Sequence, residues 1–267
     1  MVAAAKLRRA QESAVASRPY TLKMSEMLST LAASFSSEGK GANLLSGTGQ
    51  DNTYLIIVAT SNRGLAGAFN SSISRAANNK INSLIAAGKD VKIICIGKKG
   101  YDYLKRFHKK RILEVVELEG KNKIEYAEIQ TVATKVIELF NAGEFDIATI
   151  FYNKFQSAIA QIVTERQLVP LEIPANENKA EDAIPFEFEP NEEEILNVLL
   201  PRNLAIQIFS AVLENLASEH GARMTAMDNA TRNAGEMIGG LTLVYNRTRQ
   251  AAITKELIEI ISGAEAI

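Results

Sequence analysis

The feature that most constrains this chain is its C-terminal segment, residues 202–267, which contains no proline and carries the pattern of one continuous helix. At about 1.5 Å per residue, such a helix is roughly 100 Å long, far longer than a compact domain of this size needs. A helix of this length cannot bury its whole apolar stripe against its own small domain. The segment therefore predicts a partner helix, an enclosing protein, or both.

Composition and charge are those of an ordinary soluble globular protein. The chain has 267 residues, of which 46% are apolar and 23% charged, and its formal net charge is −1. This balance argues against a dedicated nucleic-acid binder. Residues 1–40 are nevertheless basic, and residues 172–194 carry nine acids and one lysine. We expect the acidic stretch to be a solvated, mobile segment.

The sequence carries no strong membrane or targeting signal. No uninterrupted apolar run approaches the roughly 20 residues that span a bilayer, and the N-terminus lacks the pattern of a secretory signal. The single cysteine, Cys95, lies in an apolar run and is expected to be a buried strand thiol. These features predict a soluble protein of the cytoplasm or an equivalent compartment.

Helical and strand patterns alternate through the first two thirds of the chain. Residues 1–36 are spaced as an amphipathic helix with a local kink at Pro19, and a glycine-rich loop follows at residues 39–49. Strands are expected at residues 54–58, 91–96, 112–118 and 146–153, and an extended strand or hairpin arm at 157–171. Helices are expected at residues 67–87, 98–107 and 124–141. This alternation predicts a parallel or mixed sheet, with residues 112–118 at its edge.

The expected fold class is α/β, with a long antiparallel coiled coil of the N- and C-terminal helices flanking a small Rossmann-like mixed or parallel sheet domain. The last helix is expected to start at Asn191 and to break or kink at Pro201. The expected parts are a coiled-coil helix at 1–38, an α/β domain at 50–175, an acidic loop at 176–190 with a short strand at 186–188, and the long coiled-coil helix at 191–267. The apolar stripe of that last helix comprises Leu204, Ile208, Val212, Leu216, Met224, Met227, Ile238, Leu241 and Tyr245.

One turn occupies a position where phosphate-binding loops occur. Residues 61–67 follow the first expected strand and precede a helix, but they contain neither G-x-G-x-x-G nor Gly-Lys-Ser/Thr. A structural turn or one that contacts a partner is the better interpretation, and a nucleotide site is the alternative. Residues 97–100 resemble this turn in kind and are a weaker candidate for a nucleotide site. We expect His108 and His220 to be exposed on helix surfaces, and we find no catalytic or metal-binding constellation.

The end of the long helix is too apolar for a free tail. Residues 257–261 read LIEII, close to a set of polar positions. These positions are Arg247, Arg249, Gln250, Thr254 and Lys255. A solvated helix face is the simpler interpretation of the polar set, but the apolar run beside it predicts that this end is enclosed.

Several runs resemble the gamma subunit of F-type ATP synthase. The most specific is YNRTRQAAITKELIEI at residues 245–260, preceded by MDNATRNAGEMI at 227–238. The N-terminal MVAAAKLRRAQ and the SRPY at 17–20 resemble the first helix of that family, and TSNRGLAG at 60–67 resembles its turn after the first strand. The resemblance covers the whole chain and is strongest at the two ends.

The resemblance implies a rotor shaft. In that family the terminal helices form an antiparallel coiled coil inside a ring of three alpha and three beta subunits, and the α/β domain forms a foot, with the epsilon subunit, on the membrane c-ring. Catalysis occurs on beta, so no catalytic site and no cofactor are expected here. The implied contacts with the ring are Arg247, Arg249, Gln250 and Thr254. The implied contacts between the foot and the lever of beta are Arg63, Gly64, Leu65 and Gly67.

The resemblance also implies a location and two departures. The expected location is peripheral, on the cytoplasmic face of a bacterial inner membrane or on the matrix side of a mitochondrial one. Family members begin upstream of a sequence like this N-terminus, so about 20 residues of the first helix are expected to be lacking. The turns around residues 253–261 are then expected to lack an antiparallel partner. With Cys95 alone, the dithiol control of the chloroplast version is not expected. The alternative function is a coiled-coil scaffold that passes no torque.

Overall fold

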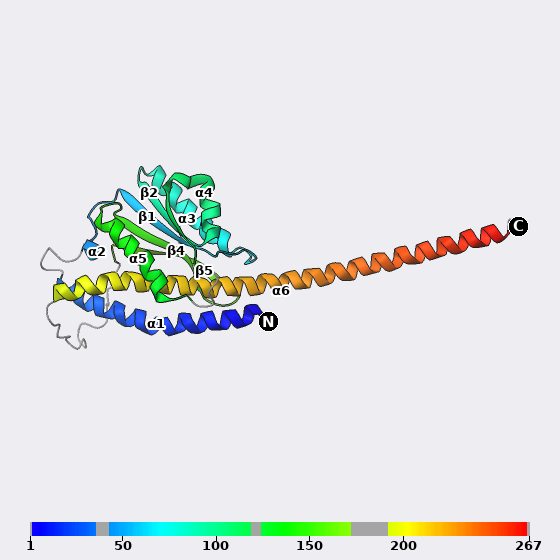
Figure 1. Cartoon of the computed structure of the whole chain (residues 1–267), viewed down its shortest axis with the longest axis horizontal. Helices are drawn as coiled ribbons and strands as arrows, with labels where there is room; N and C mark the ends of the chain where they lie inside the picture. Colours follow the sequence, from blue (N-terminus) through cyan, green and yellow to red (C-terminus); the bar gives the residue numbers. More distant parts are fainter. Residues whose placement is uncertain (1, 36–42, 119–123, 172–191, 266–267) are drawn as a thin grey trace. The chain divides into compact units, whose positions relative to one another are not determined.

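The computed structural model describes the chain except for residues 1, 36–42, 119–123, 172–191 and 266–267. The chain divides into two units, Met1–Met224 and Thr225–Ile267 (Figure 1). The expected acidic loop, its strand at 186–188 and the expected helix start at Asn191 lie outside the described residues.

A five-stranded mixed sheet forms the centre of the first unit, with the strand order β3-β2-β1-β4-β5. The strands are β1 (Thr53–Ala59), β2 (Asp90–Ile96), β3 (Ile112–Val116), β4 (Ile147–Phe155) and β5 (Gln161–Val169). The first four run parallel to one another, and β5 runs antiparallel to β4. The expected α/β class and the edge position of β3 are therefore confirmed.

The helices agree with the expected pattern in place and length. They are α1 (Val2–Phe35), α2 (Asn43–Ser46), α3 (Phe69–Ala86), α4 (Lys98–His108), the 3-10 turn η1 (Lys109–Arg111), α5 (Tyr126–Asn141) and α6 (Glu192–Glu265). One correction concerns residues 39–49, which were expected to be loop but contain α2. Leu44 of α2 is buried in the core of the first unit, and this burial favours a helical turn there.

Pro201 was expected to break or kink the last helix. The expected break is wrong, because α6 continues through Pro201. An internal proline costs a helix about 3 kcal/mol. Leu196, Leu200 and Leu204 flank the proline and are almost completely buried. Burying one such side chain contributes about 1.5–3 kcal/mol, so the flanking leucines together offset the proline.

The sheet is buried on both faces, because successive side chains of a strand point to opposite sides. From β1, Leu55 and Ile57 join the core that contains α5 and the first part of α6. Ile56 and Val58 join a second core with α3 and α4. Cys95 is fully buried in this second core, as expected, and burial raises the pKa of its thiol to about 12.

Helix α1 packs antiparallel to the first part of α6, as expected (Figure 1). Arg18 of α1 pairs with Glu214 of α6, with 2.8 Å between Nη2 and Oε1. Further along α1, Met24 and Leu28 share a core with residues of α6 near 200. The residue numbers rise along one helix as they fall along the other. This part of α6 also packs on the sheet, which the expected pairing of two flanking helices did not include.

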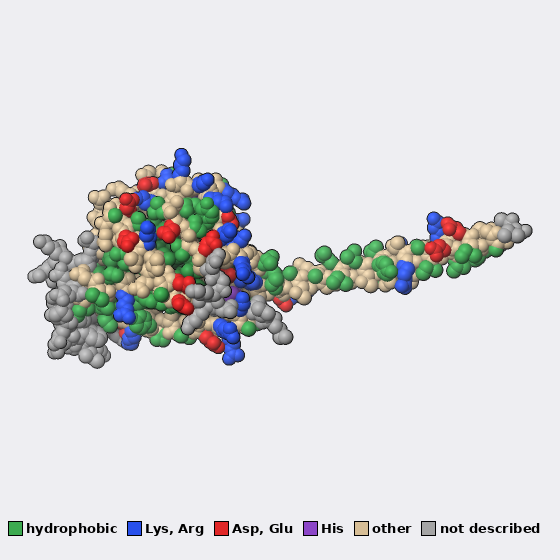
Figure 2. Space-filling view, in the orientation of Figure 1, with side chains coloured by type: hydrophobic (Ala, Val, Ile, Leu, Met, Phe, Trp, Pro, Cys, Tyr) green, Lys and Arg blue, Asp and Glu red, His purple; other side chains and the backbone are tan. Residues whose placement is uncertain are grey.

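The second unit contains the last part of α6, and nearly all of its side chains between residues 227 and 264 are exposed. Large apolar side chains lie along this surface, among polar and charged ones (Figure 2). They are Met237, Ile238, Leu241, Leu243, Val244, Tyr245, Ile253, Leu257, Ile258, Ile260 and Ile261. Between Ile195 and Ala264, α6 contains a stretch of 18 residues that is long and apolar enough to cross a bilayer, contrary to our expectation. Of that stretch, 56% is buried inside the protein. A core helix has the same composition.

Candidate functional site

The turn at residues 61–67 is held in place by hydrogen bonds from three elements. It begins at the carboxyl end of β1, where the N–H of Thr60 donates to the carbonyl of Ile96 at 2.7 Å. The Asn62 side chain donates to Leu118 O at 2.9 Å and accepts from the N–H of Lys98 at 3.0 Å. Asn70 of α3 accepts from the N–H of Ser61 at 3.0 Å. The turn is therefore a fixed feature of the sheet edge.

The same turn exposes the side chains that the resemblance assigned to partner contacts. Leu65 has a φ of 63° and is 75% exposed. A positive φ is strained for a branched residue, and an exposed leucine gains nothing by burial within its own chain. Arg63 is also exposed, while Ala66, which follows Leu65 in the sequence, is buried in the core that contains α3. Strain and exposure together are typical of a residue that contacts a partner.

Helix α6 reaches the turn through Arg223. Its Nη2 donates to the carbonyl oxygen of Gly64 at 3.3 Å and to Oε1 of Glu219 at 2.7 Å. Glu219 lies mostly out of solvent, and this burial raises the pKa of its carboxyl even though Arg223 acts in the opposite direction. The Arg223–Glu219 ion pair of α6 thus also holds the turn, through the carbonyl oxygen of Gly64.

Both histidines are less exposed than expected. His108 is buried, with 2.9 Å between its Nε2 and Oδ1 of Asn78, and burial lowers its pKa. His220 is half-buried. Burial, followed by the charges of Arg223 and Lys6, lowers the pKa of His220 to about 4. The amphipathic helix pattern did not reveal the contacts with Asn78 and Lys6, because these residues belong to other helices.

The position at which α/β sheets bind ligands is occupied by α6. In such folds ligands bind beyond the carboxyl ends of two parallel strands from which the chain leaves in opposite directions. Here those strands are β1 and β4. The Asn215 side chain of α6 accepts from the N–H of Asn153 in β4 at 3.0 Å, and Arg223 binds the turn after β1. This arrangement favours the partner-contact interpretation of residues 61–67 over the nucleotide alternative.

The second candidate site lies on the exposed part of α6. Gln250 and Thr254 are one helical turn apart, and Arg247 precedes Gln250 by three residues, so these three share one side of the helix. At about 100° per residue, Arg249 points roughly 160° away from Arg247. All four side chains are exposed. The structure brings three of the four expected residues together and places Arg249 on another side.

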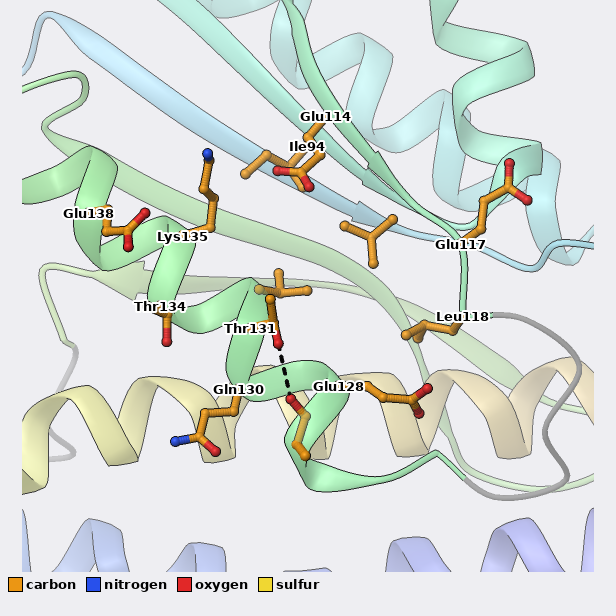
Figure 3. Close-up of a pocket in the computed structure, with 13 residues that line it drawn as sticks. Ile94, Glu114, Glu117, Leu118, Glu128, Gln130, Thr131, Thr134, Lys135 and Glu138 are labelled. Carbon is orange, nitrogen blue, oxygen red and sulfur yellow. Dashed lines mark hydrogen bonds between the residues drawn. The ribbon is translucent and has the colours of Figure 1, made fainter.

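A shallow cavity of about 700 Å³ lies between β3 and α5, where no site was expected (Figure 3). Its polar lining consists of four glutamates, three uncharged side chains and one cation, Lys135 of α5. The acidic residues are Glu114, Glu117, Glu128 and Glu138. Among the residues that the structure describes, no three carboxylate, histidine or cysteine side chains are grouped as a metal site requires.

Sequence reasoning missed the polar contacts by which α6 holds the sheet. Glu214 and Ser218 lie four residues apart within an otherwise buried face of α6. Polar residues at helical spacing inside an apolar stripe are the signal that would have revealed them, because buried polar groups need partners.

Comparison with known proteins agrees with this geometry. The chain matches the ATP synthase family over residues 1–267. It is 56% identical over 267 residues to the ATP synthase gamma chains of Methylobacterium sp. (strain 4-46) and Nitrobacter hamburgensis, covering 100% of this chain and 91% of each relative. It is 53% identical over 274 residues to that of Rhodospirillum rubrum, covering 100% and 92%.

Two solved structures share the fold. The central stalk and c-ring structure of Tetrahymena thermophila mitochondrial ATP synthase aligns with a TM-score of 0.63 at 23% identity, covering 86% of this chain and 96% of that one. A chain of Euglena gracilis mitochondrial ATP synthase aligns with a TM-score of 0.61 at 20% identity, covering 98% and 95%. These two likenesses show the fold, and the sequence matches over the whole length show the family: the chain belongs to the gamma-chain family of ATP synthase.

Proposed function

We propose that the chain is the rotor of an F-type ATP synthase and has no catalytic site of its own, coupling proton passage through the membrane sector to ATP synthesis on the beta subunits. The observation that carries this proposal is the exposed end of α6, whose large apolar side chains between residues 237 and 261 have no partner within the described chain. A helix that is apolar around most of its circumference is normally enclosed.

The partner is a ring of alpha and beta subunits that surrounds this end. Met237 and Leu241 lie on one side of the helix, and Leu257 and Ile261 lie on another. Each residue of the second pair follows its counterpart in the first pair by 20 positions, which at about 100° per residue turns it roughly 160° around the helix axis. A shaft whose sides differ presents different contacts to each surrounding subunit. The shaft can then shift the conformational equilibrium of each catalytic site only by the difference between its contact energies with the two states of that site.

The polar residues near the end of the shaft provide specific contacts with the ring. Arg247, Gln250 and Thr254 are exposed on one side of α6, with Arg249 on another. In the first unit, Arg63, Gly64, Leu65 and Gly67 belong to a fixed and strained turn, which suits contact with the lever of beta. ATP chemistry is assigned to beta, because α6 fills the position where this fold would bind a phosphate.

The foot, formed by the sheet and its helices, rests on the c-ring together with the epsilon subunit. The chain is then peripheral to the membrane, on the cytoplasmic face in a bacterium. Bacterial relatives that are 53–56% identical support this location over a mitochondrial one.

Co-purification from membranes tests this proposal. A tagged chain isolated in mild detergent should carry alpha and beta subunits in a 3:3:1 ratio with itself. A complex without stoichiometric alpha and beta would contradict the rotor and favour a scaffold. ATP titration of the isolated chain provides a second measurement, and saturable binding would favour the nucleotide alternative at residues 61–67.

A further inference from the structure

One buried carboxylate joins three elements of the first unit. Glu214 of α6 is 6% exposed. Its Oε1 accepts from Arg18 of α1, at 3.1 Å from Nε and 2.8 Å from Nη2. Its Oε2 accepts from the backbone N–H of Phe155 in β4 at 3.1 Å. The two carboxylate oxygens thus connect α6 to both α1 and β4.

Two further side chains of α6 bind the same end of β4. Asn215 Oδ1 accepts from the N–H of Asn153 at 3.0 Å, and Ser218 Oγ donates to the carbonyl of Asn153 at 3.0 Å. All three α6 residues are buried. We call Glu214, Asn215 and Ser218, with Arg18, the Glu214 junction.

The strand pairing explains why these backbone groups are available. Strand β4 pairs with β1 only as far as Phe151, whereas its pairing with β5 continues to Phe155. In an antiparallel pair, alternate residues direct their N–H and C=O away from the partner strand. Asn153 and Phe155 therefore have backbone groups on the edge of β4 that no longer pairs with β1, and α6 side chains bind these groups. The helix takes the place of the missing strand.

These contacts resist motions that apolar packing permits. Hydrophobic contacts are non-directional, so two packed surfaces can slide with little loss. Hydrogen bonds weaken steeply when their angle or length changes. Rotation of α6 against the sheet would break those made by Glu214, Asn215 and Ser218 together. Because Arg18 binds the same carboxylate, α1 is held to the same point.

We propose that the Glu214 junction is the joint through which torque passes between the helix pair and the sheet domain. This inference rests on the rotor function proposed above. It makes Glu214, Asn215 and Ser218 positioning residues for energy coupling, with Arg18 in support. None of them is assigned to nucleotide chemistry or to contact with the ring.

The test uses the assembled complex in inverted membrane vesicles, measuring ATP hydrolysis and ATP-driven proton uptake on the same sample. Glu214→Ala should keep hydrolysis within about twofold of wild type and lower proton uptake per ATP at least threefold. The proton uptake per ATP of Glu214→Gln should lie between the values of wild type and Glu214→Ala, because one amide oxygen replaces two carboxylate oxygens. Glu12→Gln is the matched control, since it removes the exposed Arg8–Glu12 pair of α1 and should leave the ratio unchanged.

A charge swap separates a joint from an ordinary ion pair. Arg18→Glu combined with Glu214→Arg restores an ion pair but leaves the N–H of Phe155 without an acceptor. The proton-to-ATP ratio should therefore stay low, and recovery to the wild-type ratio would overturn the proposal. Where Glu214→Ala fails to assemble, Asn215→Ala and Ser218→Ala decide. Each should lower the ratio, and an unchanged ratio in both overturns the joint.

The controls keep this inference apart from the proposed function. A wild-type complex that hydrolyses ATP without any proton uptake contradicts the rotor itself. A coupled wild type with equally coupled junction variants contradicts only the joint.

Discussion

The guanidinium of Arg223 connects two parts of the chain, binding the carbonyl oxygen of Gly64 at 3.3 Å and the carboxylate of Glu219 at 2.7 Å. Through this one side chain, α6 holds the turn that follows β1.

Removing Arg223 should destabilise the full chain by about 2–3 kcal/mol, because Glu219 would be left buried without its cation. Denaturant unfolding of Arg223→Ala measures this loss. The double variant Arg223→Ala with Glu219→Gln should recover part of it, since no charge then remains buried. Strictly additive losses would contradict this coupling.

Replacing Leu65 by glycine should separate stability from function. Glycine adopts the φ of 63° without strain, so the free energy of unfolding should change by roughly 1 kcal/mol or less, despite the greater freedom of the unfolded chain. ATPase turnover of the assembled complex should fall, because an exposed apolar contact is lost. Unchanged turnover would argue that Leu65 contacts no partner.

Gly97 and Thr60 approach each other too closely for a side chain. A Cβ on Gly97, whose φ is +96°, would lie 2.2 Å from the carbonyl oxygen of Thr60. Gly97→Ala should therefore destabilise the chain by about 3 kcal/mol or more. Gly143→Ala is the matched control, because its φ is +70° but no atom lies within 4 Å, and it should cost only about 1 kcal/mol. Equal losses in thermal unfolding would show that close approach is unimportant.

His220 should make the chain less stable in mild acid. The folded state holds the pKa of His220 at about 4, and the unfolded value is about 6.5. Between these pH values the unfolded state binds a proton that the folded state does not, so stability falls as pH drops from 6.5 towards 4. The loss should be about 1–2 kcal/mol, less than the full shift implies because the ring is partly exposed. His220→Gln should lack this component, and identical pH profiles of the two proteins would contradict it.

Gln250 and Thr254 should matter only in the assembled complex. Both are exposed on the same side of α6, so Gln250→Ala with Thr254→Ala should leave the unfolding of the isolated chain unchanged and lower ATPase turnover severalfold. Thr242→Ala, about two turns earlier on the same helix, serves as the control and should have a smaller effect. Turnover equal to wild type in the double variant would contradict the assigned contact with the ring.

The alternation of short apolar runs with amphipathic segments was enough to predict the sheet. Residues 54–58 and 91–96 are short apolar runs rich in β-branched residues, a pattern typical of strands buried on both faces, and they form β1 and β2. The same reasoning failed at Pro201, because local propensity was outweighed by leucines buried against distant parts of the chain.

The spacing of Glu214 and Ser218 within a buried face was a signal that these side chains have partners. The partners themselves could not be predicted, since they depend on where β1 stops pairing with β4. That end point is a property of the three-dimensional sheet and leaves no local pattern. The division into coiled coil and foot, and the partner contacts at Arg63, Gly64, Leu65 and Gly67 and at Arg247, Arg249, Gln250 and Thr254, remain predictions.

Direct observation of rotation is the most direct test of the rotor function. Lys109 is exposed in η1 and Cys95 is fully buried, so Lys109→Cys offers one reactive thiol on the foot for attaching a probe. With the ring of alpha and beta subunits fixed to a surface, addition of ATP should turn the probe in one direction. ATP hydrolysis by the fixed complex with a stationary probe would contradict the account.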